Sequence, residues 1–94
     1  MKLMMVFAVV FVSVGAWAHG SRVQAVEQAT VVALEMFETT EPRVAVDSFN
    51  AVKSWISGDQ LMVRAYYNNN AENVLYACEW DHSGHEEKMV CEKR

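Results

Sequence analysis

The chain has 94 residues, of which 12 are acidic, 8 are basic and 2 are cysteine, and its formal net charge is −4. An acidic balance without a basic cluster argues against nonspecific nucleic-acid binding, because such binding requires cationic side chains that release counterions from the phosphate backbone. A chain of this length makes one domain with a modest core.

The first residues have the order of an export signal. Lys2 precedes an apolar run that closes on residues 16–18 (Ala-Trp-Ala), with small residues at the two positions that a signal peptidase reads before His19. A retained membrane anchor is the alternative, but spanning a bilayer takes about 20 apolar residues, and this run is shorter. We therefore expect residues 1–18 to be a cleaved signal peptide and residues 19–94 to be a single secreted or periplasmic domain, with no membrane insertion after cleavage.

A capped helix is predicted directly after the expected cleavage site. Ser21 and Gln24 have the spacing of a capping box, in which each side chain accepts a hydrogen bond from the backbone N–H of the other residue. The helix should end before Pro42, because the residue before a proline avoids helical geometry. Helical spacing of the residues between predicts a buried stripe, made of Val23, Val26, Thr30, Ala33 or Leu34, and Phe37.

Beyond Pro42, stretches rich in Val, Tyr, Trp and Phe alternate with turns rich in Gly and Asn, which tolerate positive φ. Four strands are predicted, at Val44–Ile56, Leu61–Tyr67, Val74–Asp81 and Glu87–Lys93. Short connections between consecutive strands favour antiparallel pairing. The predicted fold class is therefore α+β, with one N-terminal amphipathic helix packed on a four-stranded antiparallel β-meander.

The two cysteines lie on the last two predicted strands. A hairpin folded at residues 84–85 places Cys78 opposite Cys91 and Trp80 opposite Met89. Opposed residues have Cβ atoms about 4.5–5.5 Å apart, which is close to what a disulfide requires, and an oxidising compartment preserves the bond. Free thiols and a metal site are the alternatives, but a structural zinc site usually has closer cysteine spacing. We expect one disulfide, which stabilises the domain by about 3 kcal/mol in the chain-entropy model.

The same reasoning gives a register for the preceding strands. A six-residue loop at 68–73 would pair Tyr67 with Val74 and Val63 with Cys78. This register gathers apolar side chains on one face and charged ones on the other, as expected for a sheet that is covered on one side. The first strand carries apolar residues on both faces, so we expect a β-bulge there.

A helix followed by an antiparallel meander, with a disulfide in the last hairpin, resembles the cystatin-like architecture. Residues 46–50 (Val-Asp-Ser-Phe-Asn) fall where the first inhibitory hairpin of the cystatins begins, and Cys78 and Cys91 occupy a place similar to the C-terminal disulfide of secreted cystatins. The resemblance implies a cystatin-like fold for residues 19–94. The protease-binding Gln-x-Val-x-Gly motif has no counterpart here, so no inhibitory residue is carried over. Inhibition of cysteine proteases is kept as an alternative function.

Metal binding is a second alternative. His82 and His85 lie among carboxylates in the last predicted turn, and cleavage would expose His19 with a free amine. Converging imidazoles and carboxylates bind copper or zinc. The simpler interpretation is a solvated polar turn and an N-terminal histidine without a ligand.

Catalysis is not expected. Ser83, His82 and Asp81 contain the residue types of a hydrolase triad, but neighbours on a tight turn cannot adopt its relay geometry. The expected disulfide also leaves no thiol nucleophile. We therefore expect a protein that is not an enzyme and needs no cofactor.

Four large side chains decide whether the domain has a binding surface. Phe49, Trp55, Met62 and Tyr66 either belong to the core or form an apolar patch on the sheet face away from the helix. An exposed patch of this kind needs a partner, which would be an unidentified protein or a second copy of the domain. The leading functional prediction is a noncatalytic exported protein of the binding or inhibitor type.

Overall fold

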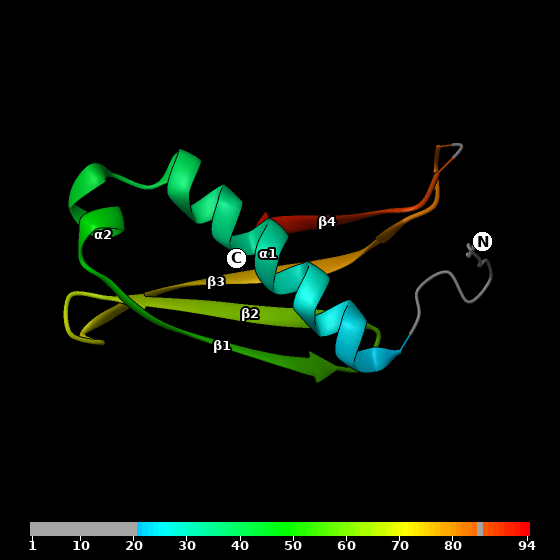
Figure 1. The fold of residues 1–94 in the computed structure, drawn as a ribbon, viewed down its shortest axis with the longest axis horizontal. Coiled ribbons are helices and arrows are strands. Elements are labelled where there is room, and N and C mark those ends of the chain that lie inside the picture. Colours follow the sequence, from blue (N-terminus) through cyan, green and yellow to red (C-terminus); the bar gives the residue numbers. More distant parts are fainter. Residues whose placement is uncertain (1–20, 85) are drawn as a thin grey trace, which may run out of the picture.

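The computed structural model describes residues 21–84 and 86–94. One long helix lies across one face of a four-stranded antiparallel sheet (Figure 1), which confirms the predicted α+β fold. The elements are α1 (Arg22–Thr40), α2 (Arg43–Asp47), β1 (Phe49–Ser57), β2 (Gln60–Tyr67), β3 (Glu72–Asp81) and β4 (Lys88–Lys93). The strands lie in the order β1-β2-β3-β4. The predicted signal peptide, His19 and His85 lie outside the described residues.

The capping box at the start of α1 is confirmed. The Gln24 N–H donates to Ser21 Oγ at 3.0 Å, and the Ser21 N–H donates to Gln24 Oε1 at 3.1 Å. At the other end, the Glu41 N–H still donates to the Phe37 carbonyl at 3.1 Å, and Pro42 follows directly. Both predicted ends of the helix are therefore correct.

The buried stripe of α1 is centred differently from the prediction. Ala33 and Phe37 are buried as expected, but Val23 is 68% exposed and Ala29 takes the central place. A small side chain lets the helix backbone come close to the sheet, so the contact is built around the two alanines. Thr30 lies on the flank of the stripe, where its hydroxyl lies 2.6 Å from Ser54 Oγ of β1.

The first predicted strand, Val44–Ile56, was wrong in its first part. Residues Arg43–Asp47 form the short helix α2, and β1 starts only at Phe49. Pro42 has φ −60°, which is already suited to a helix start, and the Ser48 hydroxyl donates to the Val44 carbonyl at 2.8 Å. These local interactions outweigh the strand preference of the two valines in the segment.

The expected β-bulge lies at the start of β1. Phe49 is opposite Tyr67 while Ala51 is opposite Tyr66, so Asn50 is the extra residue. The bulge turns Phe49 to the helix side of the sheet, where its ring centroid lies 5.7 Å from that of Phe37.

The register between β2 and β3 differs from the prediction by two residues. The observed pairs are Leu61–Cys78, Val63–Tyr76, Ala65–Val74 and Tyr67–Glu72. The predicted six-residue loop was too long, because Asn68, Asn69 and Asn70 all take positive φ and reverse the chain in a shorter turn. A shift of two residues keeps each side chain on its face. The partners were wrong, but the predicted faces are confirmed.

The disulfide between Cys78 and Cys91 is confirmed, together with the pairing of Trp80 with Met89. The two Cα atoms are 4.0 Å apart. The sulfur atoms lie under α1, 3.9 Å and 3.8 Å from the carbonyl oxygen of Ala29. The bond therefore joins the β3–β4 hairpin at the place where the helix presses on the sheet. Within the described residues, no helix has the length and apolar character needed to cross a membrane.

Candidate functional site

The sheet face that points away from α1 carries a cluster of large side chains, which we call the open face. Successive residues of a strand point to opposite faces, and the observed pairing then aligns those of neighbouring strands. The open face includes Lys53 and Trp55 from β1, Met62, Arg64 and Tyr66 from β2, Leu75, Ala77 and Glu79 from β3, and Val90 and Glu92 from β4.

Two rows of directly opposed residues form the centre of the open face, and one of them is Lys53, Arg64 and Leu75. Trp55 lies opposite Met62, which lies opposite Ala77. Ala77 is only 4% exposed, although no helix of the described residues covers this side of the sheet. Its neighbours on the adjacent strands therefore shield it, and the centre of the open face is an apolar row with charged residues around it.

Two cations lie against the indole of Trp55. Lys53 Nζ is 5.5 Å and Arg64 Cζ is 5.6 Å from a Trp55 ring centroid. Both distances are within the range of cation–π interactions, which contribute about 0.5–1 kcal/mol at exposed sites. The Arg64 Nε atom is shielded from solvent and has no hydrogen-bond partner within the described chain. A carboxylate brought to this place would therefore meet a positioned donor and two positive charges.

The structure separates the four residues of the predicted partner surface. Trp55, Met62 and Tyr66 come together on the open face, where each is half-buried. Phe49 does not join them, because the bulge turns it to the helix side, where it is 40% exposed. The predicted surface therefore consists of two separate sites.

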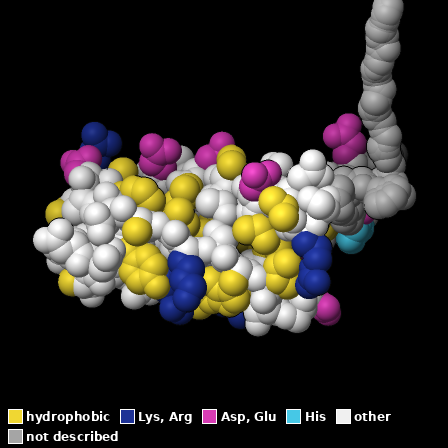
Figure 2. Space-filling model, turned by 60° about the horizontal axis from the view of Figure 1, so that its bottom comes forward, with side chains coloured by type: hydrophobic (Ala, Val, Ile, Leu, Met, Phe, Trp, Pro, Cys, Tyr) yellow, Lys and Arg dark blue, Asp and Glu magenta, His cyan; other side chains and the backbone are white. Residues whose placement is uncertain are grey.

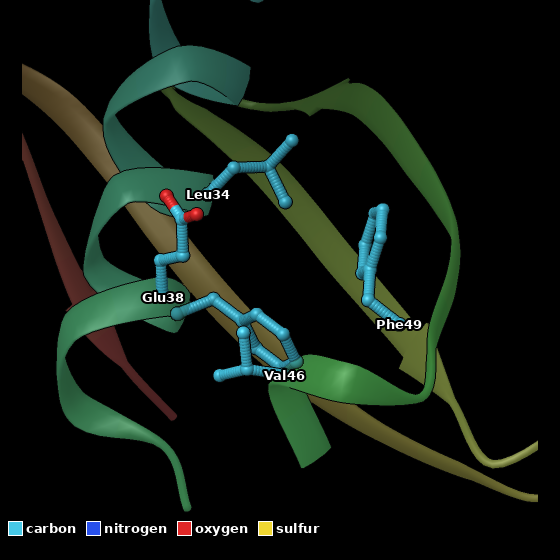
Figure 3. Close-up of a pocket in the computed structure, with 5 residues that line it drawn as sticks. Leu34, Glu38, Val46 and Phe49 are labelled. Carbon is cyan, nitrogen blue, oxygen red and sulfur yellow. The ribbon is translucent and has the colours of Figure 1, made fainter. Parts of the chain in front are cut away.

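Phe49 borders a small recess between the two helices and β1. The recess has a volume of about 220 Å³ and is lined by Leu34, Phe37, Glu38, Val46 and Phe49. Figure 3 shows Leu34 and Glu38 reaching in from α1, with Val46 from α2 and Phe49 from β1 on the other side. Ligand pockets usually measure about 300–1,000 Å³, so this recess suits a single side chain better than a substrate.

The turn before β4 holds the predicted metal and triad residues. His82 Nδ1 lies 2.5 Å from Glu87 Oε2, and the Ser83 N–H donates to Asp81 Oδ1 at 3.0 Å. The Ser83 hydrogen bond is the main reason that the pKa of Asp81 lies below its usual range. Asp81 thus accepts from the backbone of Ser83 and closes the turn. The residues at 21–84 and 86–94 contain no group of three or more potential ligands that could hold a metal ion. His19 and His85 lie outside this part of the chain, so metal binding stays a prediction.

Charges are distributed unevenly over the molecule. Figure 2 shows acidic side chains along the helix side and basic ones among the apolar side chains below it. Sequence reasoning missed Lys53 and did not connect Arg64 with Trp55. The spacing of Lys53 and Trp55 puts both on one face of a strand, but the contact with Arg64 depends on the exact pairing of β1 with β2.

No protein-family model, no curated protein and no solved structure matches the chain.

Proposed function

We propose that the domain is a noncatalytic, exported binding protein that holds a protein partner on its open face. The observation that carries the proposal is the arrangement at Trp55, where an indole lies under Lys53 and Arg64 and the Arg64 Nε donor has no partner in the described chain. Trp, Tyr and Arg are the residues most often found at the energetic centres of protein interfaces. Tyr66 lies on the same face, one row beyond Arg64.

The chemistry of the open face specifies the kind of partner. Met62 lies opposite Trp55 and Leu75 lies opposite Arg64, so both add apolar area beside the two cations. The complementary surface is apolar and carries at least one Asp or Glu side chain, which would accept from Arg64. Partners with exposed lysines in the same place would be repelled.

Export is the second part of the proposal. It is supported by the signal-like order of residues 1–18 and by the disulfide between Cys78 and Cys91, because disulfides persist mainly in oxidising compartments. The intact mass of the exported protein under nonreducing conditions tests it. The expected mass is that of a chain that begins at His19 and lacks both thiol hydrogens. A full-length mass, or two free thiols, would contradict this part.

Affinity capture on the immobilised exported protein tests the binding surface. The bait is presented to extracellular and periplasmic extracts of the source cells, and the bound proteins are quantified by mass spectrometry. A specific partner should be retained by the wild type, whereas Trp55→Ala and Arg64→Glu should each lower its affinity at least about tenfold, as loss of a central contact does.

The matched control is Val31→Ala, because Val31 is an exposed apolar residue on α1, far from the open face in the fold. This variant should retain the partner fully. Circular dichroism of each variant verifies that the fold is intact. Equal retention by the wild type, Arg64→Glu and Trp55→Ala would remove the open face as the binding site.

A further inference from the structure

The two edges of the sheet differ in their protection against further strand pairing. β4 is 6 residues long and includes Lys88, Glu92 and Lys93. β1 is 9 residues long, with Lys53 as its one charged residue and no proline. Short length and charged side chains are the usual means of keeping an edge strand from pairing with another chain, whereas a long apolar edge is a template for such pairing. The β4 edge is therefore protected and the β1 edge is not.

The free backbone groups of β1 follow from its hairpin with β2. Ser57 and Gln60 flank a two-residue turn at Gly58, whose φ is +62°, and such flanking residues form a hydrogen-bonded pair. Hydrogen-bonded and non-hydrogen-bonded pairs alternate along an antiparallel ladder. The N–H and C=O groups of every second residue therefore point away from β2, and these residues are Val52, Ser54 and Ile56.

Apolar side chains flank the same edge. Two of the large exposed apolar residues of the described chain, Phe49 and Val52, lie on β1 itself, and none lies on the other three strands. Figure 2 shows apolar side chains gathered over this side of the molecule, interrupted by basic ones. A strand added to β1 would cover part of this apolar area.

We infer that β1 pairs in antiparallel fashion with β1 of a second copy, with Ser54 opposite Ser54 on the two-fold axis. Val52 of one copy then faces Ile56 of the other on the helix side of the sheet. Lys53 faces Trp55 of the other copy on the open face, where a cation and an indole attract each other. The three outward-pointing residues of each β1 all find a partner in this register, and the two sheets join into one of eight strands.

The charge on Lys53 and the length of β1 favour this register over the two neighbouring ones. A pair centred on Lys53 would place two lysines directly opposite each other, which is destabilising. A pair centred on Trp55 would set Val52 against the turn residue Gly58, where the strand has already ended. The centre at Ser54 avoids both. The register shares Lys53 and Trp55 with the open face, but the two proposals can fail separately, because the pairing depends on the outward backbone groups of β1 whereas Arg64 lies on β2.

Ser54→Pro tests the pairing. Proline at this position removes an N–H that points away from β2, so the hydrogen bonds within the sheet stay intact while the bond to a second copy is lost. The matched control is Ser54→Ala, since both variants lose the hydroxyl contact with Thr30 but only the proline loses the N–H. Sedimentation velocity over a concentration series should show a monomer–dimer equilibrium for the wild type and Ser54→Ala. For Ser54→Pro, the dimer dissociation constant should rise at least about tenfold.

A second pair of variants keeps the inference testable if the proline disturbs the fold. Val52→Lys places a charge on the free edge and should also prevent the dimer, whereas Val31→Lys places the same charge on α1 and should leave it unchanged. Hydrogen exchange should show protection of the amides of Val52, Ser54 and Ile56 that increases with protein concentration. A monomeric wild type at every concentration overturns the inference. A dimer that persists in Val52→Lys also overturns it, and so does a dimer that leaves these amides unprotected. Either result means that the two copies associate through another surface.

Discussion

At the residue scale, Tyr76 is a core side chain whose buried hydroxyl lacks a hydrogen-bond partner in the described chain. Its side chain is 0% exposed. Thr40 lies near enough to affect it, but the Thr40 hydroxyl donates to the Met36 carbonyl at 2.7 Å. Burial first, and the Glu41 carboxylate second, raise the pKa of Tyr76. The neutral phenol is therefore the form that the fold tolerates.

Replacing Tyr76 by Phe tests this account. A buried hydroxyl without a partner costs about 1–3 kcal/mol, so Tyr76→Phe should leave the free energy of unfolding at pH 7 unchanged or raise it by about 1 kcal/mol. Urea denaturation at pH 7 provides the measurement. A loss of more than about 1 kcal/mol would mean that the hydroxyl is hydrogen-bonded in the native protein.

The raised pKa of Tyr76 also predicts how stability depends on pH. The folded pKa lies above the ordinary value of 10.0, so the contribution of the neutral phenol is fully present below pH 10 and is lost as pH rises through the folded pKa. Tyr76→Phe should therefore lose less stability than the wild type above pH 10. Tyr67→Phe is a second test, because burial also raises the pKa of Tyr67, and this variant should likewise lose less stability than the wild type above pH 10. If the alkaline loss were the same in the wild type and in both variants, neither phenol would be its cause.

At the scale of elements, local interactions and the pairing of the last hairpin were predictable, whereas the pairing of β2 with β3 was not. The Ser21 cap, the end of α1 before Pro42 and the pairing of Cys78 with Cys91 all follow from short stretches of sequence, and all are present. The β2–β3 register was wrong because it depends on how many residues the asparagine turn uses. A turn of either length leaves the same side chains on the same faces, so the apolar pattern alone cannot distinguish the two registers.

The same limit explains what could be predicted of the candidate site. The sequence pointed to Trp55 and Tyr66 as large residues without an assigned place, but their side of the sheet depended on the bulge at the start of β1. The contact of Arg64 with Trp55 crosses from one strand to the next, so it depends on register as well. The composition of the surface was therefore visible in the sequence, whereas its arrangement required the fold.

The turn between β2 and β3 gives a prediction at this scale. Asn68 and Asn70 use their side chains in hydrogen bonds to Glu72 and Asn50, so Asn69 is the position where backbone conformation can be tested most directly. Its φ is 57°, a conformation that costs a residue with a Cβ about 1–2 kcal/mol and that Asn and Gly tolerate best. Asn69→Ala should lower the free energy of unfolding by about 1 kcal/mol, as measured in urea. The control is Asn69→Gly, which should retain the stability of the wild type to within about 0.5 kcal/mol. Equal losses in both variants would point to a role of the asparagine side chain instead.

At the scale of the whole molecule, a few connections hold one helix on an otherwise open sheet. The disulfide lies under Ala29, near the middle of α1. At the end of the helix, Lys93 Nζ of β4 lies 2.9 Å from Glu41 Oε2. The net free energy of unfolding of a small domain is low, because its core buries little apolar area. Each of these connections is therefore a large share of its stability. Both connections lie on the helix side of the sheet, away from the open face.

Removing the disulfide tests how far the domain depends on it. The bond joins residues separated by 13 positions, and loss of a cross-link of this span costs about 3 kcal/mol in the chain-entropy model. The double variant Cys78→Ala, Cys91→Ala should therefore lose at least this amount, because it also leaves a void beneath α1. Reduced wild-type protein keeps both sulfur atoms, so it separates the effect of the cross-link from that of the packing. Its free energy of unfolding should fall only by the contribution of the cross-link. Urea denaturation followed by circular dichroism should show helix and sheet unfolding together in all three samples, since the cysteines lie between them. A helix that melts first in the reduced protein would show instead that the bond holds only the β3–β4 hairpin, and that α1 depends on the contacts of Ala33 and Phe37 alone.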